Sequence, residues 1–284
     1  ETVGKDPYRK SLIAATSARL LCGYVYASAG DGESTQDLVF SGHHMIAENG
    51  SVLAEAARFE NETIFSELDI HKICHERRRM STFVPENTET CVRIGFTLEK
   101  EETKLTRTFA QMPFVQSDET LKKERCEQIL SIQAQGLKKR YEHTGAKTAV
   151  IGVSGGLDST LALLVTARAF DLLGKDRNDI LAVTMPCFGT TNRTYENACR
   201  LAQTLGAKLI EVNIREAVQV HFRDISQDMD KHDVTYENGQ ARERTQVLMD
   251  LANQSNGLVI GTGDMSELAL GWATYNGDHM SMYG

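Results

Sequence analysis

The stretch Thr148-Ala-Val-Ile-Gly-Val-Ser-Gly-Gly-Leu-Asp-Ser-Thr160 gives the strongest indication of the fold of the chain. It begins with an apolar run at residues 149–153, which is typical of a strand buried in a parallel sheet. Two glycines follow, and they allow a tight turn and a close approach to a ligand. Residues 157–170 are rich in Leu and Ala and predict a helix, whose first-turn amides and dipole favour an anion. The stretch therefore predicts a strand, an anion-binding turn and a helix.

Asp158 is the unusual member of this turn, because a carboxylate repels phosphate unless a cation lies between them. We therefore expect Mg²⁺ shared between Asp158 and phosphate oxygens. Ser154, Ser159 and Thr160 add hydroxyl donors. No Lys follows the glycines, so the spacing is not that of the Walker loop. A plain Gly-rich turn with a helix cap is the alternative, but a cap needs only one Ser or Asp.

Length, charge and cysteine spacing restrict the class of protein. The 284 residues are enough for two domains. A net charge of -8 argues against a nucleic-acid surface, and no apolar run approaches the roughly 18 residues that span a bilayer. The six cysteines include no C-x-x-C pair, which favours reduced thiols and a cytoplasmic location over disulfides or zinc. The first residues are not a signal peptide and include no initiator Met, so we expect the natural protein to begin upstream.

The first part of the chain predicts a layered α/β domain over residues 1–112. Asp69 is a predicted N-cap, and Asn49-Gly50 is a predicted hairpin turn. The expected helices are 8–18 and 69–79, and the expected strands are 20–27, 38–46, 52–57, 62–68, 92–98 and 105–109.

Three residues of this part invite a chemical role. Cys22 lies in an apolar run with no His or Lys beside it, which predicts a buried, inert thiol. His43 and His44 are neighbours on a predicted strand, where side chains point to opposite faces and do not converge on a metal. We expect structural histidines whose hydrogen bonds are satisfied.

The second part alternates strands and helices after a linker at residues 113–120. Alternation of this kind predicts a doubly wound parallel sheet over residues 121–284, with ligands beyond the carboxyl ends of its strands. Ser154, Met185 and Thr262 each follow a strand end, so we expect them to share one cleft. The expected strands are 149–153, 180–185, 208–213 and 257–261, and the expected helices are 119–141, 157–170, 195–205 and 240–253.

Three further charged residues are candidates for this cleft. Glu267 follows the fourth strand and supplies a second carboxylate for Mg²⁺, although alone it would be explained as a solvated first-turn residue. Arg242 and Arg244 lie two residues apart, on different faces of a predicted helix. Either one or both bind a phosphate or a nucleotide, or they form surface ion pairs, and the residues themselves leave both possibilities open.

Two segments resemble known domains. Residues 154–159, Ser-Gly-Gly-Leu-Asp-Ser, resemble the pyrophosphate loop of the ATP pyrophosphatases, which adenylylate a carbonyl oxygen and release pyrophosphate. Residues 41–55 followed by 68–79 resemble the C-terminal half of a nitrilase-type amidase, which is an α-β-β-α sandwich with a Glu-Lys-Cys triad. In that family the triad precedes the segment that matches residue 1. The resemblance therefore assigns no glutaminase catalytic residue within this sequence.

Together with residues 184–191, 240–244, 261–267 and 275–278, these segments resemble the glutamine-dependent NAD⁺ synthetases. The resemblance implies a nitrilase-like amidase part followed by an ATP pyrophosphatase domain, in a family that continues beyond the segment matching Gly284. It implies a ligase of NAD biosynthesis that adenylylates deamido-NAD⁺ with ATP and displaces AMP with ammonia, which the amidase obtains from glutamine. It also implies assembly as a homo-oligomer.

The same resemblance implies roles for individual residues. The implied ATP contacts are Ser154, Gly155, Gly156, Leu157, Asp158, Ser159, Met185 and Thr262. The implied contacts with deamido-NAD⁺ are Asn238, Arg242, Glu267 and Asp278. The implied Mg²⁺ ligands are Asp158 and Glu267.

Two other functions compete with this one. The first is an ATP pyrophosphatase-type ligase that amidates a different carboxylate. The second is a nucleotide-binding module without chemistry, against which the pair Asp158 and Glu267 argues, because ATP binding alone does not require both.

Overall fold

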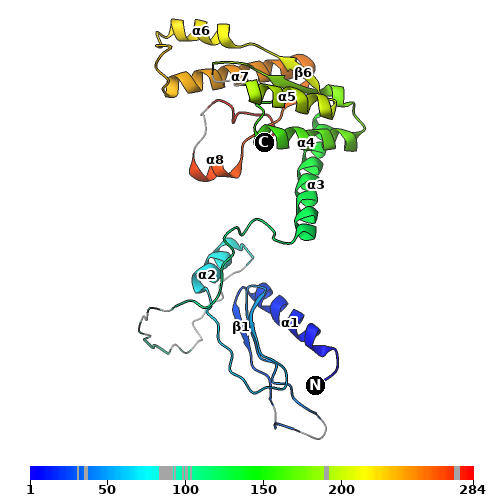
Figure 1. Ribbon diagram of the computed structural model, residues 1–284, viewed down its shortest axis with the longest axis vertical. Helices are drawn as coiled ribbons and strands as arrows, with labels where there is room; N and C mark the ends of the chain where they lie inside the picture. Colours follow the sequence, from blue (N-terminus) through cyan, green and yellow to red (C-terminus); the bar gives the residue numbers. More distant parts are fainter. Residues whose placement is uncertain are drawn as a thin grey trace. The chain divides into compact units, whose positions relative to one another are not determined.

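The computed structural model describes residues 1–30, 32–34, 38–82, 92, 94–97, 99, 102, 104–188, 192–271 and 276–284. The chain forms two compact units, Glu1–Pro113 and Phe114–Gly284 (Figure 1). The division falls at the start of the predicted linker, residues 113–120. Among the described residues, no helix combines the length and apolar character needed to cross a membrane.

The first unit contains a three-stranded antiparallel sheet of order β1-β2-β3, with α1 packed on it. Ile13 of α1 contacts Met45 and Ala47 of β2 in a small apolar cluster. Asn49 and Gly50 join β2 to β3 with φ angles of 43° and 91°, which confirms the predicted hairpin turn. The elements are α1 (Lys5–Leu20), β1 (Gly23–Tyr26), β2 (Met45–Glu48), β3 (Ser51–Glu55) and α2 (Ile70–Arg79), the last capped by Asp69 as predicted.

Several predicted strands of this unit are wrong. Residues 38–44 and 62–68 form no strand, so the predicted strand 38–46 is reduced to its last two residues, which begin β2. The described residues of the predicted hairpin, 92, 94–97 and 105–109, also form none. The side chains of Ile94 and Phe96 are exposed. Alternating apolar residues form a strand only where a neighbouring strand takes their hydrogen bonds and another layer buries one face.

The two histidines agree with the prediction, whereas Cys22 does not. His43 is 3% exposed and lies within hydrogen-bond distance of Arg9 Nη1 (2.9 Å) and Glu55 Oε1 (2.8 Å). His44 Nδ1 accepts a hydrogen bond from the Ser28 amide at 3.1 Å. Cys22 is half-buried, not fully buried. The described cysteines, which exclude position 91, are all free thiols, as predicted.

The second unit is built on a four-stranded parallel sheet of order β6-β5-β4-β7, which confirms the predicted sheet. The chain moves outward from β4 to β5 and β6, and then crosses back to place β7 on the other side of β4. The elements are α3 (Glu119–Thr144), β4 (Thr148–Gly152), α4 (Leu157–Leu173), η1 (Arg177–Asp179), β5 (Ile180–Thr184), α5 (Asn192–Leu205), β6 (Lys208–Glu211), α6 (Arg215–Asp224), α7 (Val234–Ser255), β7 (Gly257–Val259) and α8 (Met265–Leu270).

Three helices of this unit differ from the prediction. Neither α6 nor α8 was expected from the sequence, although Val218 and Phe222 of α6 lie four residues apart and are both buried. The helix predicted at residues 240–253 begins earlier, at Val234 of α7, because the Asp233 carboxylate caps the amides of residues 235 and 236.

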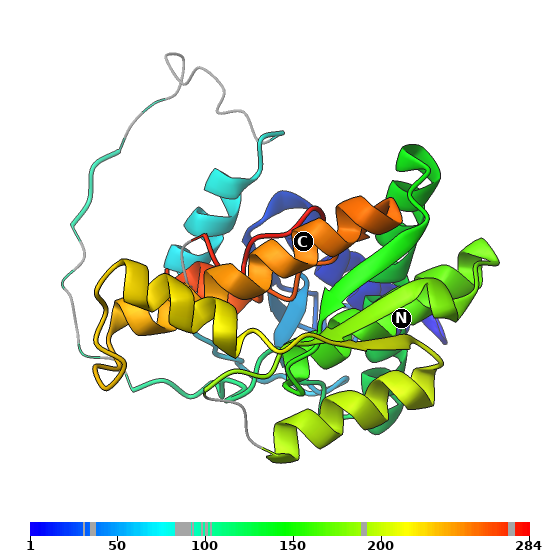
Figure 2. The same ribbon diagram turned by 90° about the horizontal axis from the view of Figure 1, so that it is seen from above.

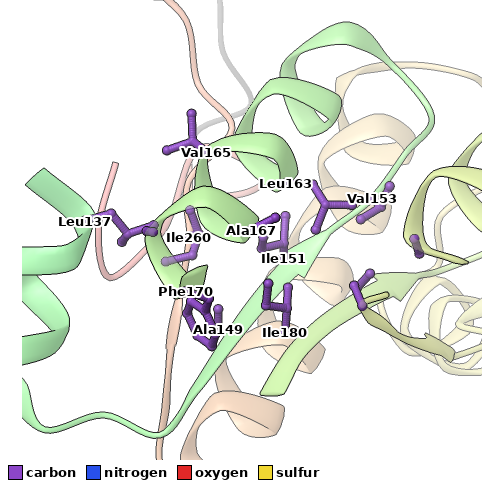
Figure 3. Packing of buried hydrophobic residues seen from close by; sticks show 14 of the residues in the cluster. Leu137, Ala149, Ile151, Val153, Leu163, Val165, Ala167, Phe170, Ile180 and Ile260 are labelled. Carbon is purple, nitrogen blue, oxygen red and sulfur yellow. The ribbon is translucent and has the colours of Figure 1, made fainter. Parts of the chain in front are cut away.

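Alternation along β4 separates two apolar cores. Ala149, Ile151 and Val153 face a core shared with α3, α4 and α5, in which Phe170 of α4 is fully buried (Figure 3). Val150 faces the opposite core, which is shared with α6 and α7. Figure 2 shows α7 and α5 on opposite sides of the sheet. Because both faces of the sheet are covered, the side chains on both faces of β4 are apolar.

The C-terminal residues extend this sheet beside β7. The Gly261 amide donates to the Tyr283 carbonyl at 2.8 Å, and the Met282 amide donates to the Val259 carbonyl at 3.0 Å. Ile260 and Tyr283 form a parallel bridge. The segment after α8 therefore returns to the carboxyl end of β7.

Candidate functional site

The site begins at the turn between β4 and α4. Gly155 has a φ of 82°, in the left-handed region that favours glycine. Gly156 is the N-cap of α4, and no side chain caps this helix, in contrast to Asp118 at α3 and Asp233 at α7. The orphan amides of an uncapped first turn suit an anionic ligand. The predicted strand, turn and helix are confirmed.

Hydrogen bonds within the turn fix its two serines. The Ser154 hydroxyl accepts from the Gly156 amide at 3.3 Å and lies 3.3 Å from the Ser159 hydroxyl. The Ser159 hydroxyl donates to the Gly156 carbonyl at 3.2 Å, and its side chain is buried. These contacts restrain the conformation of the loop between β4 and α4.

A cavity of about 550 Å³ opens at the carboxyl ends of β4, β5 and β7. The order of strands reverses between β4 and β7, and such a switch point is where parallel sheets bind ligands. The cavity wall consists of Gly152, Val153, Ser154, Gly156, Asp158, Ser159, Val183, Thr184, Met185, Cys187, Thr194, Tyr195, Gln240, Arg244, Leu248, Val259, Ile260, Thr262, Glu267, Asp278 and Met280.

Most of the predicted site residues share this cavity. The expectation that Ser154, Met185 and Thr262 lie in one cleft is confirmed. The other predicted residues in the wall are Gly156, Asp158, Ser159, Glu267 and Asp278. Four predicted residues lie outside the described wall: Gly155, Leu157, Asn238 and Arg242. The Leu157 side chain is 86% exposed.

The two predicted metal ligands differ in their local contacts. The Asp158 carboxylate is exposed and makes no hydrogen bond or ion pair with the described residues. Glu267 belongs to a capping box with Asp264, in which its Oε2 accepts from the Asp264 amide at 3.2 Å. Its Oε1 has no partner among the described residues. Glu267 therefore has two roles: it caps the first turn of α8, and it forms part of the cavity wall.

These residues fit Mg²⁺ but not a metal held by protein alone. Among the described residues, no three His, Cys, Asp or Glu side chains converge on one point. Mg²⁺ is commonly held by one or two carboxylates, with substrate phosphates and waters completing the octahedron. Asp158 and one oxygen of Glu267 supply that donor set within one cavity.

Arg244 and Asp278 meet across the cavity wall. Arg244 Nε donates to Asp278 Oδ1 at 2.9 Å, and Nη2 donates to Oδ2 at 2.7 Å. The pair joins α7 to the segment after α8. Of the two arginines that the sequence left undecided, the structure therefore places Arg244 in the cavity wall, paired with a carboxylate.

The wall also contains residues that were not predicted from the sequence, and the pKa values of two of them, Tyr195 and Cys187, are raised. The Tyr195 hydroxyl donates to Glu211 at the end of β6, and this hydrogen bond raises the pKa of Tyr195. Burial raises the pKa of the Cys187 thiol, so Cys187 stays protonated and is a poor nucleophile. Gln240 lies four residues before Arg244 and also belongs to the wall. Residues at this i, i+4 spacing share one face of a helix, so Gln240 could have been predicted beside Arg244.

Asn238 carries an unusual buried group. Its side chain is 5% exposed, and its Oδ1 has no hydrogen-bond partner in the described part of the chain. A buried acceptor without a partner costs free energy, so such groups are rare and point to a partner that the chain itself does not supply.

Comparison with known proteins shows to which family the chain is similar. The family model described as NAD synthase matches residues 129–282, which is more than half of the chain. The chain is 43% identical over 298 aligned positions to a glutamine-dependent NAD(+) synthetase of Mycobacterium leprae, covering 99% of this chain and 44% of the relative. It is 40% identical over 147 positions to an NH(3)-dependent NAD(+) synthetase of Aeropyrum pernix, covering 51% of this chain and 50% of the relative.

A solved structure supports the fold. A glutamine-dependent NAD+ synthetase from Acinetobacter baumannii, solved in complex with ADP, superimposes with a TM-score of 0.51 at 24% identity, covering 99% of this chain and 45% of the other. The chain thus spans less than half the length of the glutamine-dependent relatives that it matches.

Proposed function

Because this chain belongs to the NAD synthase family, we propose that it forms part of a glutamine-dependent NAD⁺ synthetase. In the proposed reaction the carboxylate of deamido-NAD⁺ attacks the α-phosphorus of ATP and pyrophosphate leaves. Ammonia then displaces AMP to give the amide of NAD⁺. The observation that carries the proposal is the uncapped turn at residues 154–159, whose Asp158 carboxylate shares one cavity with the carboxylate of Glu267.

The second unit supplies the nucleotide half of this reaction. The amides that begin α4, with the hydroxyls of Ser154 and Ser159, bind the phosphates of ATP. Asp158 and Glu267 would hold Mg²⁺, which would offset the phosphate charge. Met185 and Thr262 contact the nucleotide from the ends of β5 and β7. The contribution of the protein is positioning and charge neutralisation.

The acceptor binds beside ATP. We assign deamido-NAD⁺ to the side of the cavity formed by α7 and the segment after α8, where Glu267 and Asp278 lie. Asn238 and Arg242 belong to the same proposed site, although they lie outside the described wall. The unpartnered Oδ1 of Asn238 supports a ligand contact there.

The first unit belongs to the proposed ammonia-producing half. We propose that its sheet and helix are part of a nitrilase-like amidase that hydrolyses glutamine, in a homo-oligomeric cytoplasmic enzyme. The free thiols in the described part of the chain fit a reducing compartment.

The test is pyrophosphate release by the full-length protein with Mg²⁺, ATP, ammonia and one acceptor at a time. We expect release with deamido-NAD⁺ and none above background with nicotinate or aspartate. Equal release with another carboxylate would identify a different ligase. ATP binding without pyrophosphate release under any of these conditions would identify a binding module.

A further inference from the structure

Arg244 is the single cationic side chain among the described residues of the cavity wall. The same wall contains the carboxylates of Asp158, Glu267 and Asp278. A cavity for anionic ligands with this excess of negative charge needs cations where the ligands bind. If Mg²⁺ occupies Asp158 and Glu267, Arg244 is the remaining positive group that the described wall offers to an anion.

The Arg244 guanidinium is held in a fixed orientation. Asp278 accepts from Nε and Nη2, which form one edge of the planar group. Nη1, on the other edge, has no hydrogen-bond partner among the described residues. The Arg244 side chain is 30% exposed and Asp278 is 47% exposed, and both belong to the cavity wall. A guanidinium fixed by a carboxylate loses less freedom when it binds a second anion.

A second Arg–Asp pair in the same unit shows what a structural pair looks like. Arg177 donates from Nε and Nη2 to Asp171 at 2.8 and 2.6 Å, with exposures of 39% and 50%, close to those of the cavity pair. However, Arg177 also donates from Nη1 to the Leu205 carbonyl at 3.0 Å. Arg177 uses both edges within the protein, whereas Arg244 leaves one edge for the cavity.

We propose that Arg244 is a ligand-binding residue that contacts a phosphate or carboxylate group of a substrate in the cavity, and that Asp278 is the positioning residue that orients it. This proposal deepens the proposed function and rests on it. The anionic group comes from ATP or from deamido-NAD⁺. The planar fork of Arg244 makes a directional contact that a Lys ammonium does not reproduce.

The experiment compares Arg244→Lys with Arg177→Lys in the full-length protein. Calorimetry measures the Kd for Mg-ATP and, separately, for deamido-NAD⁺, and thermal unfolding measures the Tm. We expect Arg244→Lys to weaken one of the two ligands by roughly tenfold to a hundredfold, because it loses a charge-assisted hydrogen bond. Arg177→Lys should leave both Kd values unchanged. The ligand that loses affinity identifies the source of the anion.

Two results overturn the proposal. The first is unchanged affinity for both ligands in Arg244→Lys. The second is a fall in Tm with equal weakening of both ligands, which is what a purely structural pair would produce. Pyrophosphate release by the wild-type protein is measured on the same sample. If release depends on deamido-NAD⁺ while Arg244→Lys binds normally, this inference fails and the proposed function stands.

Asp278→Asn tests the positioning role. It removes the acceptor charge without removing volume, so the Arg244 fork loses its fixed orientation. We expect weaker binding of the same ligand that Arg244→Lys affects, by a smaller factor. Normal or tighter binding of that ligand contradicts an orienting role for Asp278.

Discussion

Gly155 lies against the backbone of Thr194, at the point where the turn after β4 meets the beginning of α5. A β-carbon built on Gly155 would stand 2.9 Å from the Thr194 carbonyl carbon and closer still to its oxygen. The φ of Gly155 is also positive, at 82°. Both the conformation and the space at this position therefore require glycine, and the anion-binding turn depends on that contact.

Gly155→Ala should disrupt the turn. We expect the free energy of unfolding of the second unit to fall by about 2–4 kcal/mol, from backbone strain together with overpacking, and ATP binding to be lost. The matched control is Gly174→Ala at the end of α4, where φ is 64° and no atom lies within 4 Å. The control should lose only about 1 kcal/mol and bind ATP normally. Denaturant titration and calorimetry measure both, and equal effects of the two variants would contradict the close contact.

Asp158→Asn should stop adenylate formation without unfolding the protein. The carboxylate is exposed and has no partner among the described residues, so its loss removes no packing. We expect pyrophosphate release to fall by about 100-fold or more, as when one group that stabilises developing charge is removed, with an unchanged Tm. The assay uses saturating Mg²⁺ and deamido-NAD⁺. Turnover equal to wild type would exclude Asp158 as a metal ligand.

Gly239→Ala has two opposing effects on the stability of α7, a gain in helix propensity and a clash with Phe222. Helix propensity favours Ala over Gly by about 1 kcal/mol. The new β-carbon, however, would lie 3.0 Å from Cζ of Phe222 and closer still to Cε1, and Phe222 is fully buried. Overpacking a fixed ring costs about 1–3 kcal/mol, so we expect a net loss of stability of about 1 kcal/mol.

The same substitution in a Phe222→Leu background is the control for Gly239→Ala, because the ring is then absent. We expect Gly239→Ala to be neutral or stabilising in that background. Denaturant titration measures both backgrounds. A gain in stability in the wild-type background would show that helix propensity outweighs the contact.

His43→Leu should destabilise the first unit more than His44→Leu. His43 is buried between Arg9 and Glu55, and both would lose a hydrogen-bond partner. We expect a loss of about 2 kcal/mol for His43→Leu, and about 1 kcal/mol or less for His44, which is less buried and accepts one amide hydrogen bond. Urea unfolding of the two variants measures the difference. Equal losses would show that the network around His43 contributes little.

Glu55 should make the first unit sensitive to acid. The hydrogen bond from Lys10, and to a lesser extent the one from His43, lower the pKa of Glu55 below its ordinary value of 4.5. A carboxyl whose pKa is lowered by folding contributes stability above the unfolded value and loses that contribution as the pH falls through the folded value. We therefore expect stability to fall as the pH drops below the ordinary value of 4.5, less steeply in Glu55→Gln. Identical pH profiles of the two proteins would contradict this contribution.

The sequence by itself determined the parallel strands of the second unit, the helices α3, α4 and α5, and the anion-binding turn. These features are encoded locally, because an apolar run, two glycines and a following helix suffice to predict residues 148–160. The same local reasoning identified the Asp69 cap and the Asn49-Gly50 turn. It placed Asp158 and Glu267 after separate strands, which was enough to expect a shared cleft.

Only the tertiary structure decided which long-range partners meet. Residues 38–44, 62–68 and 94–97 have apolar side chains, but they form no strand because a strand depends on a neighbour that local pattern does not specify. Arg242 and Arg244 are indistinguishable by composition, and the rotation of α7 against the sheet places only Arg244 in the cavity wall, beside Asp278. Burial and ion pairing arise from contacts distant in sequence, so no local pattern could separate these two arginines.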